Sequence, residues 1–424
     1  MKFIADFHVH SKYSRATSHE MSPDVIARWA KIKGIALIGT GDFTHPIYFD
    51  ELRSKFEETG NGLLRLKNGD NSVSFMLTSE VSNIFSQAGR LRKIHTLIFA
   101  PDFDTVQKIN SALGKRGKLS SDGRPIFGFP VKDLVKIVLD ISDNCFLIPA
   151  HAWTPWFSLF GSNSGFDSIE ECFGEESRNI FSIETGLSSD PEMNWRLSAL
   201  DGITLISNSD AHSPNKIGRE SNIFDCEIDY REIVDAIKRK DRKRFLATIE
   251  FFPEEGKYHY NGHRDCGVLM SPKETKEKGL LCPVCRKKIT VGVMQRVDDL
   301  ADRPEGFIPE GEIPSIHIIP LVEIIADAIG VGVGTVSATK EYEKMIGMGL
   351  SEFSILLDIP VEELANFSQP KVAEGIKRMR EGKVNIVPGH DGVYGKISLF
   401  EDEMPKEVKD IPEPLAIAGQ MDLF

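Results

Sequence analysis

The chain has 424 residues and a net charge of −12, and it is 41% hydrophobic and 27% charged. That length allows two or three domains with a large core, and the composition is ordinary for a globular protein. No apolar run reaches about 18 residues, so no transmembrane helix is expected, and the negative charge argues against a protein coated in nucleic acid while leaving room for a local basic groove. The chain starts on a strand-like segment with no signal-peptide pattern, which favours a cytoplasmic location.

Residues 1 to about 250 alternate strand-like and helix-like segments. The strand-like segments are Lys2–Val9, Gly34–Gly39, Ser74–Ser79, Lys93–Ala100, Cys145–Ala150, Ile180–Glu184, Ile203–Asn208 and Phe245–Ile249. The helix-like segments include Pro23–Lys33, Phe103–Leu113, Pro130–Ile141, Pro191–Leu200 and Tyr230–Arg239. This alternation predicts an α/β fold with a parallel sheet, either open or closed into a barrel.

Two histidines stand two residues apart where the first strand is expected to end, His8 and His10. On a strand this spacing places both rings on one face. More His, Asp and Glu side chains follow at the ends of later strands: Asp42, Glu80, His95, His151, Glu184, Asp210 and His212. In a barrel those ends meet at one face, and buried ionisable groups are costly unless they are paired or bind metal. We therefore predict a polynuclear metal site, although alone His95 would be an ordinary strand histidine and Glu80 a helix cap.

These segments resemble the polymerase-and-histidinol-phosphatase (PHP) family of metal-dependent phosphoesterases. The matching motifs are His8-Val9-His10 with Tyr13-Ser14, Gly39-Thr40-Gly41-Asp42, Thr78-Ser79-Glu80, His95, Pro149-Ala150-His151 and Ser209-Asp210-Ala211-His212. The resemblance implies a distorted barrel of about seven strands. It also implies Zn²⁺, Mn²⁺ or Mg²⁺ held by His8, His10, Glu80 and Asp210, with Glu80 bridging to an ion on His95 and His151. Asp210 and His212 again have same-face spacing. Asp42 joins His8, His10, Glu80 and Asp210 in the catalytic set.

The sequence departs from the PHP pattern at two places. Arg15 stands where the family often has an acidic residue, and Asp42 is followed by Phe43 instead of histidine, with His45 three residues on. Both positions usually serve a third ion, so two ions are expected and a third is left open. Arg15 is a candidate to hold a phosphate, with a surface ion pair as the alternative.

A cysteine cluster follows the α/β part of the chain. His263 and Cys266 precede Cys282-Pro283-Val284-Cys285 by about fifteen residues, a spacing typical of a structural Zn²⁺ site. His259 is the alternative histidine ligand. Three further cysteines lie among apolar neighbours and are expected to be buried thiols: Cys145, Cys172 and Cys226.

The remaining chain is expected to be helical to residue 400, with segments at Leu321–Ile329, Glu341–Met348, Ser351–Leu357 and Lys371–Glu381. Residues 401–414 are acidic and proline-rich, as in a flexible linker. The chain ends in a segment that resembles the peptide that docks on DNA sliding clamps, in which the matching residues are Gln420, Leu423 and Phe424. A frayed tail is the alternative.

The order of these units resembles the endonuclease Q family of DNA-repair nucleases. We divide the chain into a PHP barrel (1–252), a zinc finger (253–292), a helical DNA-contacting domain (293–400) and a tail (401–424). The resemblance implies hydrolysis of DNA 5′ to a deaminated base (hypoxanthine, uracil or xanthine) or an abasic site. A pocket for the flipped base is expected from Trp153, Trp156, Ser188, Ser189 and Asp190, with core packing as the alternative for the tryptophans. Two other functions stay open, a small-molecule phosphatase like histidinol phosphatase and a non-catalytic DNA-binding module.

Overall fold

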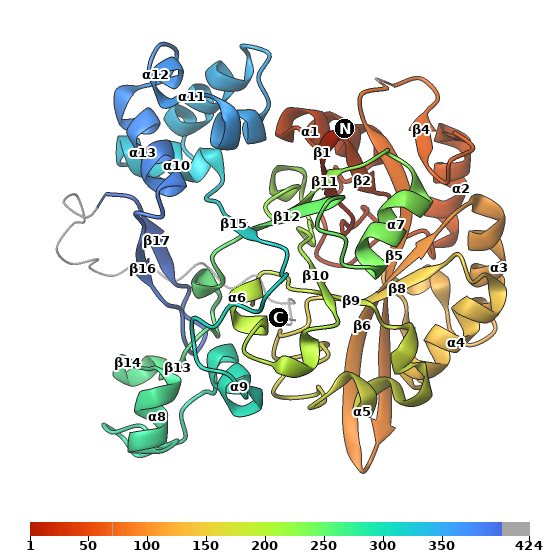
Figure 1. Cartoon of the computed structure of the whole chain (residues 1–424), viewed down its shortest axis with the longest axis horizontal. Helices are drawn as coiled ribbons and strands as arrows, with labels where there is room; N and C mark the ends of the chain where they lie inside the picture. Colours follow the sequence, from red (N-terminus) through yellow and green to blue (C-terminus); the bar gives the residue numbers. More distant parts are fainter. Residues whose placement is uncertain (70, 401–424) are drawn as a thin grey trace.

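The structure is a computed structural model that describes residues 1–69 and 71–400. An α/β part formed by the first 250 residues lies on one side, and the later residues form a helical group and a small finger on the other (Figure 1). The clamp-like residues Gln420, Leu423 and Phe424 lie outside the described residues. None of the helices described is both long and apolar enough to cross a membrane.

The α/β part contains all eight strands expected from the sequence. Its strands are β1 (Lys2–Asp6), β2 (Leu37–Gly39), β3 (Phe56–Glu58), β4 (Leu64–Leu66), β5 (Ser74–Gln87), β6 (Arg90–Ala100), β7 (Ile126–Phe127), β8 (Phe146–Pro149), β9 (Ser182–Glu184), β10 (Thr204–Ile206), β11 (Ser221–Asp225) and β12 (Phe245–Glu250). Strand β15 (Ser315–His317), from the later residues, completes the main sheet, which runs β15-β12-β11-β1-β2-β5-β4-β3. β6 lies beside β5 and β8 beside β6, while β9 and β10 pair separately.

The sheet is mixed, whereas the alternating pattern predicted a parallel one. β1, β2 and β5 are parallel, but β5 and β6 form a long antiparallel hairpin, and β11 runs antiparallel to both β1 and β12. Ala88 and Gly89 join β5 to β6 with positive φ values of 51° and 73°. A two-residue turn of this kind can connect only antiparallel strands.

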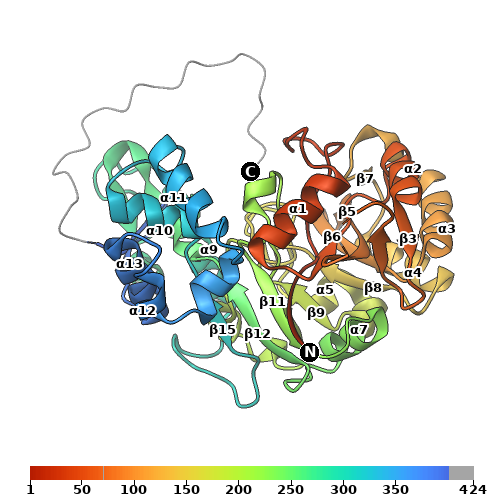
Figure 2. The ribbon, with the colours of Figure 1, turned by 90° about the horizontal axis from the view of Figure 1, so that it is seen from above.

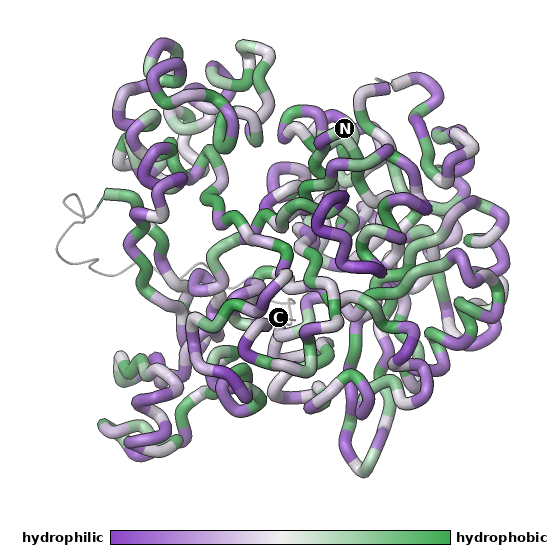
Figure 3. Tube along the Cα trace, in the orientation of Figure 1, coloured by the Kyte–Doolittle hydropathy of each residue, from purple (hydrophilic) through white to green (hydrophobic). Residues whose placement is uncertain are grey.

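Helices surround the strands, and the central strands are largely hydrophobic whereas the outer helices carry hydrophilic stretches (Figure 3). The helices of this part are α1 (Pro23–Lys33), α2 (Pro46–Lys55), α3 (Phe103–Gly114), α4 (Val131–Ile141), α5 (Ile169–Phe173), α6 (Pro191–Asn194) and α7 (Tyr230–Lys238). Helix α1 has the predicted bounds because Pro23 starts it and Gly34, at φ +92°, ends it in the left-handed conformation. The expected helix at 191–200 is only four residues long.

The later residues form a finger and a helical group, and the helical group lies on the side opposite α2 and α3 (Figure 2). The finger side contains β13 (Asn261–His263), β14 (Val268–Met270), α8 (Pro272–Lys278) and α9 (Val293–Leu300), and the helical side contains α10 (Leu321–Ile329), α11 (Val336–Ile346), α12 (Val361–Leu364), α13 (Pro370–Arg380), β16 (Asn385–Val387) and β17 (Lys396–Ser398). The glycines after α10 form its left-handed end at Gly330 and the turn before α11. These glycines therefore belong to the connection between two helices.

Two contacts fix the helical group to the α/β part. Strand β15 (Ser315–His317) pairs in parallel with β12 and so extends the main sheet. The buried Lys33 Nζ lies 2.7 Å from Glu352 Oε2, and that carboxylate also accepts hydrogen bonds from Leu321 N–H and the Tyr342 hydroxyl. A buried ion pair with added hydrogen bonds is costly to break, because either charge alone would stay buried.

Candidate metal centre

Five segments bring the strand-end residues together. His8 and His10 follow β1, where Val9 forms a bridge with Ala211, and Asp210 precedes that bridge. His151 follows β8. Glu80 lies inside β5, which continues seven residues beyond it to Gln87, and His95 lies on β6. Glu80 and His95 therefore come from the middle of the strands of the β5–β6 hairpin, while the other residues follow the ends of their strands.

The backbone is strained at two of these positions and at Asp42. Asp42, His151 and Asp210 have φ values of 45°, 31° and 46°, a region that residues other than glycine seldom adopt. Such conformations cost about 1–3 kcal/mol each and persist where the surrounding structure holds them for function. Next to Asp42, Gly41 has φ +65°, and a Cβ there would come within 2.2 Å of the Val9 carbonyl oxygen. Glycine is required for this loop to pass so close to the first.

One group of ligand atoms comes from His8, His10, Glu80 and Asp210, and all four atoms lie within 4.8 Å of one another. His10 Nε2 is 3.0 Å from Asp210 Oδ1 and 3.3 Å from Glu80 Oε2, and His8 Nε2 is 3.5 Å from Asp210 Oδ1. Both Nε2 atoms and Asp210 Oδ1 are buried without a hydrogen-bond partner. Buried polar atoms that converge without a partner suit a metal ion.

A second group shares Glu80 with the first. Glu80 Oε1 lies 2.8 Å from His95 Nδ1 and 3.0 Å from His151 Nε2, while Oε2 faces the first group. The three residues of this second group are buried, and their ligand atoms also lie within 4.8 Å of one another. The two oxygens of one carboxylate thus point at two adjacent ligand sets. Histidine and carboxylate donors suit Zn²⁺ and Mn²⁺.

Two further carboxylates orient the first pair of histidines. Glu184 oxygens lie 3.0 Å from His8 Nδ1 and also accept from the Asn208 amide and the His151 N–H. Asp42 lies 3.0 Å from His10 Nδ1. A carboxylate behind a histidine fixes its ring orientation and leaves the far nitrogen for a metal. The sequence places Glu184 among the polar residues at strand ends, but the PHP resemblance assigns it no role.

Asp42 is one of those orienting residues and is in neither ligand group. Its second oxygen accepts from the Ser11 N–H, the Ser11 hydroxyl and the Ser14 hydroxyl at 2.6–2.8 Å. Burial alone would raise the pKa of Asp42, but His10 and the Ser11 donors hold it below its usual value. We had placed Asp42 in the catalytic set, and the structure places it behind His10.

His212 and Arg15 lie near the groups without joining them. The ring of His212 is 4.4 Å from that of His10, and its Nδ1 is 2.8 Å from the Asp210 carbonyl oxygen. The Arg15 side chain is 74% exposed and turns toward Asp122, 3.6 Å away. His45 stacks on Tyr13 at 4.5 Å. Among the residues that the structure describes, no third ligand group forms around Asp42 and His45.

The expected base-pocket residues fall into two classes. Trp153 is 1% exposed, packs on Phe160 and donates its indole N–H to Asn194, so it is a core residue, which was the alternative. Trp156 is half-buried and meets Tyr258 edge-on at 5.8 Å. Ser188 is half-buried too, whereas the buried Ser189 bonds the Thr185 carbonyl. Trp156 and Ser188 are therefore the members of this set with accessible side chains.

Asp190 joins the α/β part to β15. It caps α6 through the Met193 N–H and lies 3.3 Å from His317 Nε2. Glu192 completes a group whose ligand atoms lie within 4.8 Å of one another. Burial lowers the pKa of His317, but Asp190, Glu192 and Glu250 together raise it to about 9. His317 is therefore a cation held among carboxylates at neutral pH.

This pairing predicts a pH-dependent stability. The pKa of His317 is about 9 in the folded chain against 6.5 for free histidine, so its stabilisation is complete below pH 6.5 and is lost as the pH rises through 9. We expect the advantage of the wild type over His317→Gln in free energy of unfolding to shrink by up to about 3 kcal/mol across that window. Denaturant unfolding of both proteins from pH 6 to 10 measures it. A difference that stays constant with pH would refute the assignment.

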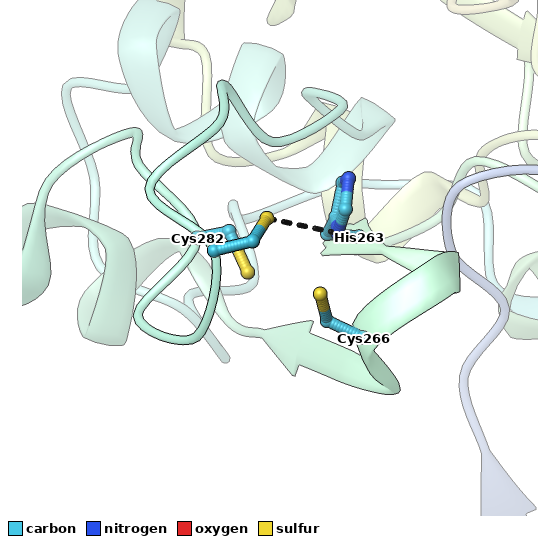
Figure 4. A group of neighbouring side chains, drawn as sticks. His263, Cys266 and Cys282 are labelled. Carbon is cyan, nitrogen blue, oxygen red and sulfur yellow. Dashed lines mark hydrogen bonds between the residues drawn. The ribbon is translucent and has the colours of Figure 1, made fainter.

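The cysteine cluster forms a separate group in the finger. One ligand atom each from His263, Cys266, Cys282 and Cys285 lies within 4.8 Å of the others. Figure 4 shows His263, Cys266 and Cys282 turned toward one another. Burial raises the pKa of the Cys282 thiol, but backbone N–H groups of Cys285 and Val284 outweigh it and lower that pKa. The donor set suits a structural Zn²⁺. His259, the alternative ligand, is outside the group.

Comparison with solved structures decides the family. The lesion-specific endonuclease PfuEndoQ from Pyrococcus furiosus matches with a TM-score of 0.84 and 31% identity, over 96% of this chain and 98% of that chain. A structure of endonuclease Q in complex with a 27-mer duplex substrate with an abasic lesion at the active site matches with a TM-score of 0.82 and 30% identity, over 97% of this chain and 100% of that chain. The chain belongs to the endonuclease Q family. The resemblance read from the motifs and their order is confirmed.

Two uncharacterized proteins are also similar to this chain. The uncharacterized protein YqxK of Bacillus subtilis is 31% identical over 93% of this chain and 99% of its own length. The uncharacterized protein MJ0043 of Methanocaldococcus jannaschii is 36% identical over 266 residues, which is 60% of this chain but only 31% of that protein. A family model named MJ0043 C-terminal domain matches residues 320–383, which include α10 to α13.

Arg124 also lies at this centre, although no motif in the sequence points to it. Its Nη1 donates to Glu80 Oε2 at 3.0 Å, and its side chain is 23% exposed. It lies in the loop before β7, in a part of the sequence for which neither a strand nor a helix is expected. Arg124 comes close to Glu80 only because that loop packs against the segment after β1, where the Gly123 N–H bonds the Tyr13 carbonyl.

Proposed function

We propose that the protein is a metal-dependent DNA-repair endonuclease that hydrolyses the phosphodiester bond 5′ to deaminated bases and abasic sites. The observation that carries the proposal is the pair of largely buried ligand groups that share Glu80, in a chain that matches PfuEndoQ over 96% of its length. Two divalent ions, when bound, would supply a hydroxide at neutral pH and neutralise charge on the phosphoryl oxygens. Glu184 and Asp42 keep His8 and His10 in the orientation that this requires.

DNA is the proposed substrate because the relative solved with an abasic duplex matches this chain over 97% of its length. The finger adds exposed basic side chains next to its ligand group, at Arg286, Lys287 and Lys288. Cations of this kind bind the phosphate backbone without reading sequence. A damaged base must leave the stack before it can be inspected, and we place Trp156 and Ser188 near its pocket. The sliding clamp is a further proposed partner, through the tail outside the described residues.

The test is cleavage of an end-labelled duplex that carries one deoxyinosine, with Mg²⁺, Mn²⁺ or Zn²⁺ supplied. We expect one cut 5′ to the lesion, no cut in the undamaged duplex, and no cut with Asp210→Ala. Cleavage rates of duplexes with deoxyuridine or an abasic site, compared with the deoxyinosine duplex, show which lesion is preferred. Hydrolysis of a phosphate monoester without cleavage of any lesion duplex would reject the repair function and favour a small-molecule phosphatase.

A further inference from the structure

We propose that Arg124 is a catalytic residue that binds a non-bridging oxygen of the scissile phosphate beside the metal ions. This inference rests on the proposed function, since it names a second cation for the same site. It starts from a contact on the shared ligand: the guanidinium donates to the oxygen of Glu80 that faces His8 and His10.

The backbone around Arg124 is fixed from both sides. The Gly123 N–H donates to the Tyr13 carbonyl at 3.0 Å, and the Gly123 carbonyl accepts from the Thr44 hydroxyl at 3.1 Å. On the other side the Pro125 carbonyl accepts from the Ser82 N–H at 3.0 Å. The guanidinium is thus presented by a loop that is held to the site and is not a mobile surface side chain.

Close packing explains why this loop sits where it does. A Cβ on Gly123 would lie 2.2 Å from Ser14 Oγ and 2.4 Å from Asp42 Oδ2, so only glycine lets the loop approach the residues behind His10. Asp122 secures the same segment by accepting from the backbone N–H groups of Arg15 and Arg124. The Arg15 side chain therefore turns toward Asp122, whereas the Arg124 side chain points to Glu80.

The charge at the centre calls for such a group. The two ligand groups and the two orienting residues contribute four carboxylates, Glu80, Asp210, Asp42 and Glu184, and hydrolysis adds negative charge on the phosphoryl oxygens. Among the residues described, Arg124 is the one Lys or Arg side chain that forms an ion pair with a carboxylate of either ligand group.

Arginine also has the donors that this role needs. A guanidinium carries five N–H groups in a planar fork that matches phosphate, and one of them is used on Glu80. The side chain is 23% exposed, and Asp210 of the first ligand group is 21% exposed, so the centre is accessible to solvent at these two residues. Glu80 would hold Arg124 in place while the other donors reach the phosphate.

The test compares Arg124→Gln and Arg124→Lys with a matched control, Arg116→Gln, which removes an exposed arginine from the end of α3. Three quantities are measured on the full chain: bound metal per chain by mass spectrometry, affinity for inorganic phosphate by calorimetry with Mn²⁺ present, and hydrolysis of bis(4-nitrophenyl) phosphate and of the lesion duplex.

Arg124→Gln is expected to keep its metal and to bind phosphate at least about 10-fold more weakly, since a charge-assisted hydrogen bond is lost. Its kcat is expected to fall by about 10²–10³-fold with a smaller change in KM, as when a donor to the transition state is removed. Arg124→Lys should recover part of the loss because it keeps the charge without the fork, and Arg116→Gln should match the wild type.

Two results would overturn the proposal. Loss of bound metal in Arg124→Gln in proportion to its loss of phosphate affinity would make Arg124 a structural partner of Glu80. Unchanged phosphate affinity and kcat would remove it from catalysis altogether. Neither phosphate binding nor the small diester depends on lesion recognition, so failure to cleave lesion DNA would reject the repair function without deciding the role of Arg124.

Discussion

Replacing Glu80 with glutamine is expected to lower kcat/KM for lesion cleavage by about 10³-fold or more and to remove most of the metal bound by the α/β part. Glu80 offers one oxygen to His8 and His10 and the other to His95 and His151. An amide has one neutral oxygen and an NH₂ group that cannot bind a cation. Losing both sites removes several kcal/mol of transition-state stabilisation, and each 1.4 kcal/mol is tenfold in rate.

The matched control for Glu80→Gln is Glu184→Gln. Glu184 lies outside both ligand groups and contacts His8 at Nδ1 and the backbone N–H of His151, so its loss disturbs the orientation of ligands without removing one. Changes of this kind typically cost 10–100-fold in activity or metal affinity. The measurements are bound metal, with zinc in the finger counted separately, and initial rates of both variants. The loss is expected to be larger in Glu80→Gln than in Glu184→Gln. Equal losses in the two variants, or full metal retention by Glu80→Gln, would contradict a bridging carboxylate.

Replacing Cys282 with alanine is expected to release one Zn²⁺ per chain and to unfold the finger. Cys282 is fully buried, and its backbone closes the turn by bonds with Lys287 and Arg286. Binding of structural zinc contributes about 10–16 kcal/mol in zinc-finger peptides at pH 7, and little else holds so small a unit. Its own apolar cluster contains only Met270, Cys282 and Ile289 as buried members.

Cys172→Ala is the control for the finger, because it removes a buried thiol from the α/β part. Limited proteolysis is expected to cut near residues 263–290 in Cys282→Ala and not in the control. Duplex binding should fall while hydrolysis of bis(4-nitrophenyl) phosphate persists, since the ligand groups of the α/β part are separate. A Cys282→Ala protein that keeps a full complement of zinc would exclude this group as the site.

The sequence by itself determined eight of the strands and the chemical class of the site. Eight strands lie where apolar runs predicted them, because burial on both faces requires such runs. The ligand types could also be read off, since His8 and His10 share a face by the period of a strand and the cysteine spacing is that of a metal turn. The order of these motifs was enough to indicate the endonuclease Q family.

The PHP resemblance implied the two ligand sets that share Glu80, but only the tertiary structure decided how their residues meet and which other side chains join them. The pairing of β5 with β6 brings His95 and Glu80 to one place, and the strand pattern alone suggested a separate parallel strand instead. Asp42 lies behind His10, and Trp153 lies in the core, because contacts with Ser11, Ser14 and Asn194 fix them there. Arg124 had no local signal at all. Its position depends on a loop packing across residues more than a hundred positions away, and periodicity and spacing describe only near neighbours in the chain.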